Sequence, residues 1–436
     1  MLAVNRTQID AAEFSNRLLT YERMAHFRRI EGRRIALCLS DPVDVVRLVL
    51  LVRGQGGSVL LIHGDTPLET ALHQAGQAGC SGLVYQNPEN WISAGQDRYA
   101  KPEDTLAAGL EHELPPAYGT SSGNEPSLLQ FSSGTTGSAK LIRRTWQEID
   151  IELAAYNEAL ETDESEVPIV LPSVTHSYGL LCGVLASLRR GASPVIVTNR
   201  NPKFALNLIR DTPKHLVYGV PPLLHILSSF PGESVPFHKI MSSGAPMPGS
   251  LYDKLRPVVP VMMQQYGCSE AGCISISNQM ETNADMGKPL GHLQVAVSQD
   301  EAHPSELLVT TNSRKISTGD IGYLSEQGNL RVVSRMDDVI NVSGLKVFPM
   351  EVEDVLSRCT GIRESVVYRG QHPVMGETVK AQIVAEPAVA AQEVMDWCMQ
   401  WLPPYKVPSE IRIVSEIPKN TGGKISRRLL EMGDLS

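Results

Sequence analysis

A ten-residue run rich in serine, threonine and glycine is the first feature of the chain suited to chemistry. The run is Phe131-Ser-Ser-Gly-Thr-Thr-Gly-Ser-Ala-Lys140, and the apolar stretch 128–131 predicts a short buried strand leading into it. Polyphosphate oxygens are acceptors only, so they need many backbone N–H and hydroxyl donors with little side-chain bulk nearby. The run predicts a phosphate-binding loop, although most stretches of this composition are solvated loops. It is not a Walker loop, because Leu141 follows the lysine.

Four later segments contain residue types that suit a nucleotide. They are Gln264-Gln-Tyr-Gly-Cys-Ser-Glu-Ala-Gly272, Ser317-Thr-Gly-Asp320, Arg335-Met-Asp-Asp338 and Ile417-Pro-Lys-Asn-Thr-Gly-Gly-Lys424. An aspartate at the mouth of a sheet can accept both hydroxyls of a ribose. Taken singly, each segment has an ordinary reading: Thr-Gly-Asp is a common turn, and a lysine on a Gly-Gly loop is typical of a solvated tail.

Together, the five segments resemble the adenylate-forming superfamily in type and order. This superfamily contains acyl-CoA synthetases, nonribosomal peptide adenylation domains and aryl acid activating enzymes. The continuation Lys140-Leu-Ile-Arg-Arg-Thr145 resembles the aryl acid branch in particular. Ala139, Leu141 and Ser334 depart from the usual family form.

The resemblance implies a role for each matching residue. Tyr266 offers a flat face to adenine, the Ser269 hydroxyl meets the α-phosphate, and Glu270 holds Mg²⁺, a hard cation that prefers carboxylate and phosphate oxygens. Lys424 binds the acid and the α-phosphate together. The implied catalytic residues are Lys424, Glu270, Ser269 and Lys140. The implied nucleotide-binding residues are Ser133, Gly134, Thr135, Thr136, Gly137, Gly244, Ala245, Tyr266, Asp320 and Arg335.

The implied acid pocket favours a substrate without an α-amino group. Relatives that activate α-amino acids carry an aspartate shortly after the strand that ends here at Pro172, whereas this chain has His-Ser-Tyr-Gly at 176–179. Glu270 is the only charged residue in the expected pocket segments, so a buried ammonium would lack a partner. The aryl-type continuation favours an aromatic acid lying between Tyr178 and the Gly244–Ala245 backbone, and short acyl acids remain open. The implied pocket residues are His176, Ser177, Tyr178, Gly219, Ser243, Gly267, Cys268 and Cys273.

The implied reaction has two steps. ATP and the acid first give an acyl adenylate and pyrophosphate, with Mg²⁺ as cofactor. A small carboxyl-terminal domain then turns about Asp337 and presents Gly344 at a channel for a phosphopantetheine thiol. The leading acceptor is a freestanding acyl carrier protein, and CoA is the alternative. A non-catalytic AMP or acyl-adenylate binding protein is the alternative of another class, against which Glu270, Asp320, Arg335 and Lys424 argue.

Strands alternate with helices along the first part of the chain, which predicts β-α-β units and a mainly parallel sheet. Residues 1–30 have helical tendency and residues 87–126 predict a surface connection. Thr145-Trp-Gln-Glu148 has the capping-box spacing that opens a helix. The fold expected is α/β, with a large multi-layer domain that includes a small barrel-like part, followed by a small mobile α+β domain. The expected bounds are 1–336 and 337–436.

Composition and charge narrow the class of protein. The 436 residues are 42% hydrophobic and 20% charged, with a net charge of −9 and no basic stripe, which argues against a nucleic-acid partner. The longest apolar run is far shorter than a membrane span. The chain has seven cysteines, an odd number without a CxxC pair, and no signal peptide at its amino end. This predicts reduced thiols and a cytoplasmic protein.

Overall fold

The computed structural model describes residues 2–23, 27, 30–86, 105–109, 125–131, 140–230, 237–342, 345–372, 376–419, 425 and 427–433. The chain divides into two compact units. Unit 1 comprises Met1–Ser132, Ala139–Gly244 and Gly267–Cys273. Unit 2 comprises Ser133–Ser138, Ala245–Tyr266 and Ile274–Ser436.

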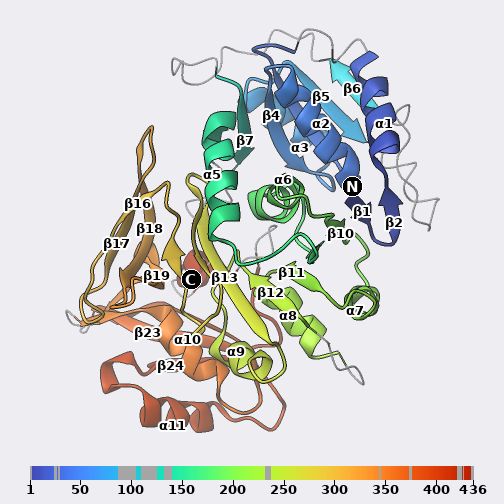
Figure 1. Cartoon of the computed structure of the whole chain (residues 1–436). Coiled ribbons are helices and arrows are strands. Elements are labelled where there is room, and N and C mark those ends of the chain that lie inside the picture. The colour runs from blue at the N-terminus through green and yellow to red at the C-terminus, as the bar shows by residue number, and fades with distance from the viewer. Residues whose placement is uncertain are drawn as a thin grey trace. The chain divides into compact units, whose positions relative to one another are not determined.

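The first sheet of unit 1 has the strand order β6-β5-β3-β4-β7-β8. The four inner strands run parallel, while β6 and β8 pair antiparallel at the edges. Figure 1 shows α2 and α3 lying against this sheet. The apolar run 35–39 of β3 is wholly buried, as expected for a parallel strand covered on both faces. The strands are β3 (Arg34–Leu39), β4 (Ser58–His63), β5 (Gly82–Gln86), β6 (Thr105–Gly109), β7 (Ser127–Phe131) and β8 (Leu141–Thr145).

Unit 1 contributes a second run of strands in the order β12-β11-β9-β10-β1-β2. The pairs within β11–β12, β9–β11, β9–β10 and β1–β10 are parallel, and only β1–β2 is antiparallel. The carboxyl ends of parallel strands share one edge, which brings the segments after β9, β11 and β12 together. The strands are β1 (Leu2–Val4), β2 (Thr7–Ile9), β9 (Val167–Val170), β10 (Val195–Ile196), β11 (His215–Gly219) and β12 (Lys239–Ser242).

The helix α5 begins where the local sequence predicts. At the start of α5, Thr145 Oγ1 accepts from Glu148 N at 3.1 Å and Glu148 Oε2 accepts from Thr145 N at 2.8 Å, so the predicted capping box is confirmed. The helices are α1 (Ala11–Arg23), α2 (Pro42–Gly54), α3 (Leu68–Gln77), α5 (Trp146–Ala159), the π-helix η3 (Tyr178–Leu185), α6 (Ala186–Arg189), α7 (Pro202–Arg210) and α8 (Pro221–Ser228).

Unit 2 contains two groups of strands before residue 336. One has the order β15-β14-β13 and the other is the antiparallel sheet β16-β17-β18-β19, seen edge-on in Figure 1. The elements are α9 (Gly249–Leu255), β13 (Val261–Cys268), β14 (Gly272–Ser277), β15 (Lys288–Pro289), β16 (Gln294–Ala296), β17 (Ser305–Thr310), β18 (Lys315–Leu324) and β19 (Leu330–Arg335). The turn between β13 and β14 belongs to unit 1.

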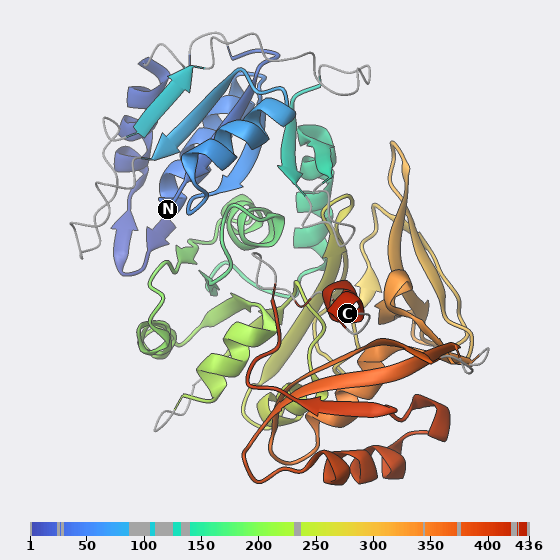
Figure 2. The same cartoon turned by 180° about the vertical axis from the view of Figure 1, so that it is seen from behind.

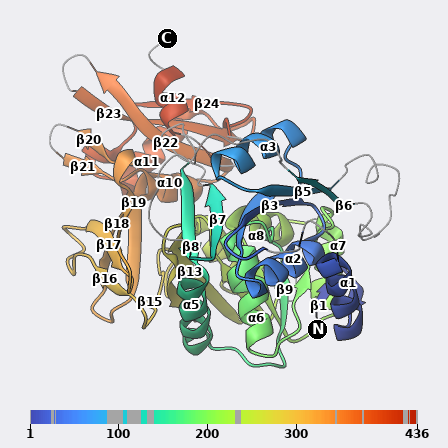
Figure 3. The same ribbon diagram turned by 90° about the horizontal axis from the view of Figure 1, so that it is seen from above.

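The last hundred residues of unit 2 build a sheet of order β21-β20-β23-β22, with β24 parallel to β23. Figure 2 shows this sheet from behind, with α11 in red running along it, and Figure 3 shows α12 beside β22. The elements are η4 (Met336–Asp338), β20 (Ile340–Val342), β21 (Leu345–Val347), α10 (Pro349–Ser357), β22 (Ile362–His372), β23 (Gly376–Ala385), α11 (Ala391–Trp401), η5 (Pro404–Lys406), β24 (Glu410–Ile413) and α12 (Arg427–Gly433).

Three local expectations need correction. The amino-terminal 30 residues form β1 and β2 before the helix α1, because β1 finds a parallel partner in β10, far along the chain. The connection 87–126 includes the strand β6, which pairs with β5. The Ser317–Asp320 segment lies inside β18, where the backbone of Gly319 has φ +69 within a ladder that continues on both sides. The domain boundary at 336 stays a prediction.

Candidate active site

Three residues predicted to bind the nucleoside meet in unit 2. Tyr266, at the unit 2 end of β13, donates its hydroxyl to Asp320 Oδ2 at 2.5 Å. Arg335, at the end of β19, pairs with the other oxygen of Asp320 at 2.9 Å. Antiparallel pairing places Asp320 directly opposite Arg335. The structure therefore brings together residues that are separated by more than fifty positions in sequence.

Opposing effects act on the pKa of the Asp320 carboxylate. Burial raises its pKa above the ordinary value, whereas the Tyr266 hydroxyl and the Arg335 guanidinium act in the other direction. Asp320 is 6% exposed, while the Arg335 side chain is 46% exposed. A carboxylate oriented by two donors keeps lone pairs for the hydroxyls of a ribose. The predicted ribose roles of Asp320 and Arg335 are compatible with this geometry and stay predictions.

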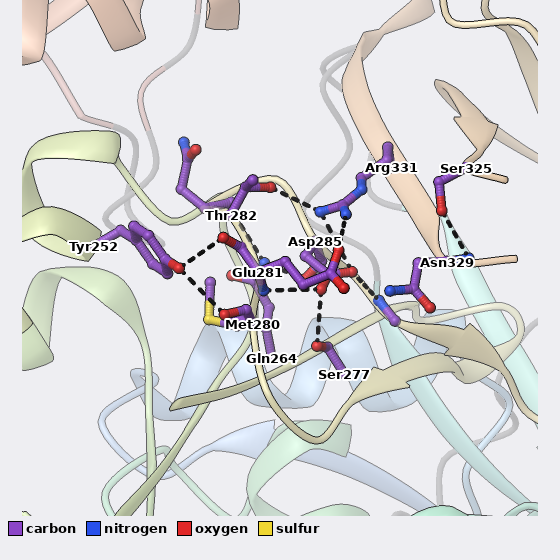
Figure 4. Close-up of polar contacts among 12 residues, drawn as sticks. Tyr252, Gln264, Ser277, Met280, Glu281, Thr282, Asp285, Ser325, Asn329 and Arg331 are labelled. Carbon is purple, nitrogen blue, oxygen red and sulfur yellow. Dashed lines mark hydrogen bonds and ion pairs between the residues drawn. The ribbon is translucent and has the colours of Figure 1, made fainter. Parts of the chain in front are cut away.

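A buried polar network in unit 2 supports the strands that carry this trio (Figure 4). Asp285 is fully buried and accepts from Ser277 Oγ at 3.2 Å and from the backbone N–H of Gly287 at 3.0 Å. Arg331 of β19 lies 3.5 Å from the same carboxylate. Gln264 of β13 donates to the Asp285 carbonyl at 2.9 Å. The network thus links the strand of Tyr266 to the strand of Arg335.

The predicted phosphate and metal residues Ser269 and Glu270 lie on the β13–β14 turn, in unit 1. Both are partly exposed. Among the described residues, no group of three or more His, Cys, Asp and Glu side chains forms a metal cluster. A single carboxylate is nevertheless a common magnesium ligand when substrate phosphates supply further oxygens. Glu270 therefore fits the magnesium role that the resemblance implies.

The predicted acid-pocket residues of unit 1 gather around Tyr178. The Tyr178 hydroxyl donates to the carbonyl oxygen of Met241 at 2.6 Å and lies 3.3 Å from that of Gly219. Ser243 donates its N–H to the same Gly219 oxygen at 3.3 Å. Tyr178 also opens the π-helix η3, and such helices occur frequently at functional sites. Thus the ends of β11 and β12 and the start of η3 meet at one place.

Ser177 and His176 differ in their surroundings. Ser177 donates its hydroxyl to Gln130 Oε1, and Gln130 Nε2 donates to the Thr175 carbonyl at 3.0 Å. Because its proton is used in this way, Ser177 faces other partners as an acceptor. His176 is exposed, and its ring centroid lies 6.4 Å from that of His63.

The two cysteines predicted to line the pocket are not equivalent. Cys268 is partly exposed, while Cys273 is buried. Burial, followed by the neighbouring Cys182 thiol, raises the pKa of Cys273 well above its ordinary value. Burial also raises the pKa of Tyr178, with Tyr218, Cys182 and Cys273 contributing. Cys273 is therefore a neutral thiol rather than a nucleophile, and its place in the acid pocket stays a prediction. None of the seven cysteines, all of which lie in the described ranges, forms a disulfide.

The predicted hinge is held by two arginines of the carboxyl-terminal part. Arg369 donates to the backbone carbonyls of Asp337 at 2.9 Å and Val339 at 3.0 Å. Arg427, the first residue of α12, binds the Asp338 carboxylate at 2.8 Å. Asp337 lies in η4 at an exposed position.

Several predicted residues lie outside the described part of the chain, and their roles stay predictions. Lys140 and Gly244 are described; Lys140 directly precedes β8, and Gly244 follows β12 with φ +85. Ala245 begins the unit 2 segment. The residues outside the described ranges are Ser133, Gly134, Thr135, Thr136, Gly137, Gly344 and Lys424.

Sequence reasoning missed Gln130, Arg144 and Glu152. Gln130 lies in the apolar strand before the loop, where one polar residue in a buried run was the available signal. Arg144 and Glu152 are buried charges that lie behind Gly272 and Cys273. Counting Glu270 as the only charge of the pocket segments was correct for those segments. The paired charges come from β8 and α5, which the count did not include.

Comparisons with known proteins identify the family of the chain. The model of the AMP-binding enzyme family matches residues 30–311, and the model of the AMP-binding enzyme C-terminal domain matches residues 351–424. The chain belongs to the AMP-binding enzymes. A 3,4-dihydroxybenzoate–[aryl-carrier protein] ligase of Bacillus anthracis is 51% identical over 436 residues, covering 100% of both chains.

Solved structures of the family show the same fold. ATP-bound MatB from Rhodopseudomonas palustris superimposes with a TM-score of 0.82 at 18% identity, covering 99% of this chain and 95% of that one. The o-succinylbenzoate CoA synthetase of Bacillus subtilis with its acyl-adenylate intermediate gives 0.78 at 21% identity, with the same coverage. The predicted α/β fold class is confirmed. Among the described helices, none is long and apolar enough to cross a bilayer.

Proposed function

We propose that this enzyme uses ATP to activate an aromatic carboxylic acid as its acyl adenylate and transfers the acyl group to the phosphopantetheine thiol of an aryl carrier protein. The observation that carries the proposal is the 51% identity, over the full length of both chains, to an enzyme named for this reaction. The Tyr266–Asp320–Arg335 arrangement supports the nucleotide half of it.

In the first step, a carboxylate oxygen of the acid attacks the α-phosphorus of ATP. The bond from that phosphorus to the bridging oxygen breaks, and pyrophosphate leaves with the bonding electron pair. Tyr266, Asp320 and Arg335 hold the nucleoside, while Ser269 and Lys140 bind phosphate oxygens. Glu270 would hold Mg²⁺, which would supply positive charge against the phosphates. Lys424 offsets the repulsion between the two anions, so that catalysis is mainly positioning and electrostatics.

In the second step, the thiolate attacks the acyl carbon and AMP leaves. Movement of the small domain about Asp337 replaces Lys424 by the segment of Gly344. The contacts of Arg369 with the backbone carbonyls of Asp337 and Val339 support a defined pivot there. Cytoplasmic location remains the expectation that goes with the reduced thiols.

The acid is expected to be a dihydroxybenzoate, with 3,4-dihydroxybenzoate as the first candidate. The buried wall formed by Tyr178 and Cys273 is flat or apolar, and Ser177 presents an acceptor suited to a phenolic hydroxyl. The Glu152 carboxylate, which accepts the backbone N–H of Cys273, is already paired with Arg144. An α-ammonium group would therefore lack a partner, at a cost of several kcal/mol.

Acid-dependent exchange of labelled pyrophosphate into ATP tests the first step. The panel consists of 3,4- and 2,3-dihydroxybenzoate, benzoate, short fatty acids and common amino acids. A preference for a benzoate is expected, and a preference for any α-amino acid would contradict the proposal. Mass spectrometry of a phosphopantetheinylated aryl carrier protein, with CoA in a parallel reaction, tests the acceptor. Faster thioester formation on CoA than on the carrier would reject the carrier assignment.

A further inference from the structure

A buried ion pair lies behind the turn that carries Ser269 and Glu270. Arg144 comes from β8 and Glu152 from α5, and they are 3% and 1% exposed. Arg144 Nη2 donates to Glu152 Oε2, while Glu152 Oε1 accepts the backbone N–H of Cys273 at 2.7 Å. One carboxylate therefore links the strand after the predicted phosphate loop, the capped helix and the end of the turn.

The β13–β14 turn packs closely against this ion pair. Gly272 has φ +79, and a Cβ built on it would lie 2.5 Å from both Arg144 Nη1 and Glu152 Oε2. At the other end of the turn, a Cβ on Gly267 would lie 2.3 Å from the Gly272 carbonyl oxygen. Both glycines are required by close approach, and the path of the turn follows the position of the pair.

A gain in folding stability does not by itself explain the Arg144–Glu152 ion pair. Arg144 Nη1 is buried and has no hydrogen-bond partner among the described residues. Burial acts to lower the pKa of Arg144, but the Glu152 carboxylate outweighs it, so the guanidinium stays charged. Replacing such a pair with apolar groups is often neutral or stabilising. What the pair supplies, which apolar side chains do not, is an acceptor for Cys273 N–H at a fixed position.

We propose that Arg144 and Glu152 are positioning residues for the adenylation step, which fix the turn so that Ser269 and Glu270 face the phosphates and Mg²⁺. The proposal rests on the proposed function. Arg144 lies on β8, which begins directly after Lys140, so the pair also sets the separation between that lysine and the turn. A displacement of about 1 Å at such a site is enough to lower the rate about 100-fold.

Three substitutions disturb the pair in different ways. Glu152→Gln preserves the shape and an acceptor but removes the charge opposite Arg144. Glu152→Asp retains the charge and draws the carboxylate away from Cys273 N–H. Gly272→Ala forces the turn away from the pair. The matched controls are Glu158→Gln, an exposed position on the same helix, and Arg143→Gln, whose guanidinium contacts Ser127 Oγ and a backbone carbonyl instead.

The readout is the free Mg²⁺ concentration that gives half-maximal pyrophosphate exchange at saturating acid, normalised to folded enzyme. The three variants should raise it by about 10- to 100-fold, as outer-shell changes do at metal sites, while the controls stay within about twofold of the wild type. Thioester formation from preformed acyl adenylate should change by less than about threefold, because that step does not use these phosphates.

A lower melting temperature with unchanged Mg²⁺ dependence would overturn the proposal and leave the pair a purely structural feature. If Glu152→Gln and Gly272→Ala do not fold, Glu152→Asp decides, because its charge pairing is retained. Calorimetry of Mg·ATP binding without acid gives an independent measurement. Weakened binding in the variants supports the inference even if no benzoate is exchanged, an outcome that would reject the proposed function alone. Unchanged binding and unchanged Mg²⁺ dependence would reject the inference alone.

Discussion

Two arginines, the buried Arg144 of unit 1 and the partly exposed Arg427 of unit 2, hold segments next to predicted catalytic residues, but they differ in how fully they are paired. In unit 2, Arg427 donates to both oxygens of Glu353 at 2.7 and 2.8 Å, to Asp338 at 2.8 Å and to a backbone carbonyl of β22 at 2.8 Å. In unit 1, Arg144 donates to Glu152, and its Nη1 has no partner among the described residues.

Because they are paired differently, the guanidinium groups of Arg427 and Arg144 have different roles. The donors of Arg427 match fixed acceptors on α10, η4 and β22, so this residue ties the start of α12 to the core of the small sheet. Burial acts to lower the pKa of Arg427, but the carboxylates of Glu353 and Asp338 more than offset this effect and raise it. Arg144 instead leaves one nitrogen unsatisfied and holds a turn in place. We expect Arg427 to matter more for stability and Arg144 more for the use of Mg·ATP.

The largest effect on stability is expected for Arg427→Met. Removal of the guanidinium leaves two carboxylates, only about one-fifth exposed, without their cation. The free energy of unfolding, measured with urea, should fall by about 3–5 kcal/mol. Arg428→Met, at the exposed neighbouring position, is the control and should change it by less than about 0.5 kcal/mol. A loss below 1 kcal/mol for Arg427→Met would show that the hydrogen bonds of Arg427 do not tie α12 to the small sheet.

The buried carboxylate of Asp41 offers a further comparison, because its contribution to the free energy of unfolding depends on pH. Asp41 accepts the backbone N–H groups of Val43 at 2.8 Å and Asp44 at 3.3 Å at the start of α2. Burial, followed by the Asp44 carboxylate, raises the pKa of Asp41 to about 7.

The raised pKa of Asp41 means that the folded protein holds its proton longer than the unfolded chain. The contribution to stability is present below the ordinary pKa and is lost as the pH rises towards 7. Asp41→Asn keeps a capping oxygen and removes this titration. Compared with the wild type, its free energy of unfolding should rise by about 1–3 kcal/mol between pH 5 and pH 8. A difference that stays flat, or that runs in the opposite direction, would contradict the assignment.

Lysine at either arginine position compares the two sites directly. An ammonium at position 427 can serve one or two of the acceptors that the guanidinium serves, whereas at position 144 it can still reach the single carboxylate. Arg427→Lys should therefore lower the free energy of unfolding by about 1–2 kcal/mol more than Arg144→Lys. Equal losses in chemical denaturation would remove the distinction between the two sites.

The smallest effect is expected for Tyr266→Phe, which removes one hydroxyl from a well-paired trio. Asp320 keeps Arg335 but loses part of its orientation. The KM for ATP should rise about 3- to 10-fold, corresponding to about 0.7–1.4 kcal/mol, with little change in the KM for the acid. Tyr252→Phe, whose hydroxyl binds the carbonyls of Met280 and Glu281 instead, should leave the KM for ATP unchanged.

The sequence by itself determined the elements and the order of the motifs. The β-α alternation predicted a parallel sheet, and Thr145 with Glu148 predicted the start of α5, because these signals depend on residues that are close in the chain. The resemblance supplied Tyr266, Asp320 and Arg335, which the structure brings into contact. The expected helix near the amino end and the plain connection after β5 were incomplete, because β1 and β6 exist only through distant partner strands.

Only the tertiary structure decided which side chains support the predicted ones. Glu152 and Cys273 are more than a hundred residues apart, and no local pattern shows that a carboxylate on α5 accepts a backbone N–H of β14. Likewise, Gly272 is one glycine among thirty-five until Arg144 occupies the space where its Cβ would lie. Such contacts depend on how strands and helices pack, and packing is set by the whole core rather than by neighbouring residues.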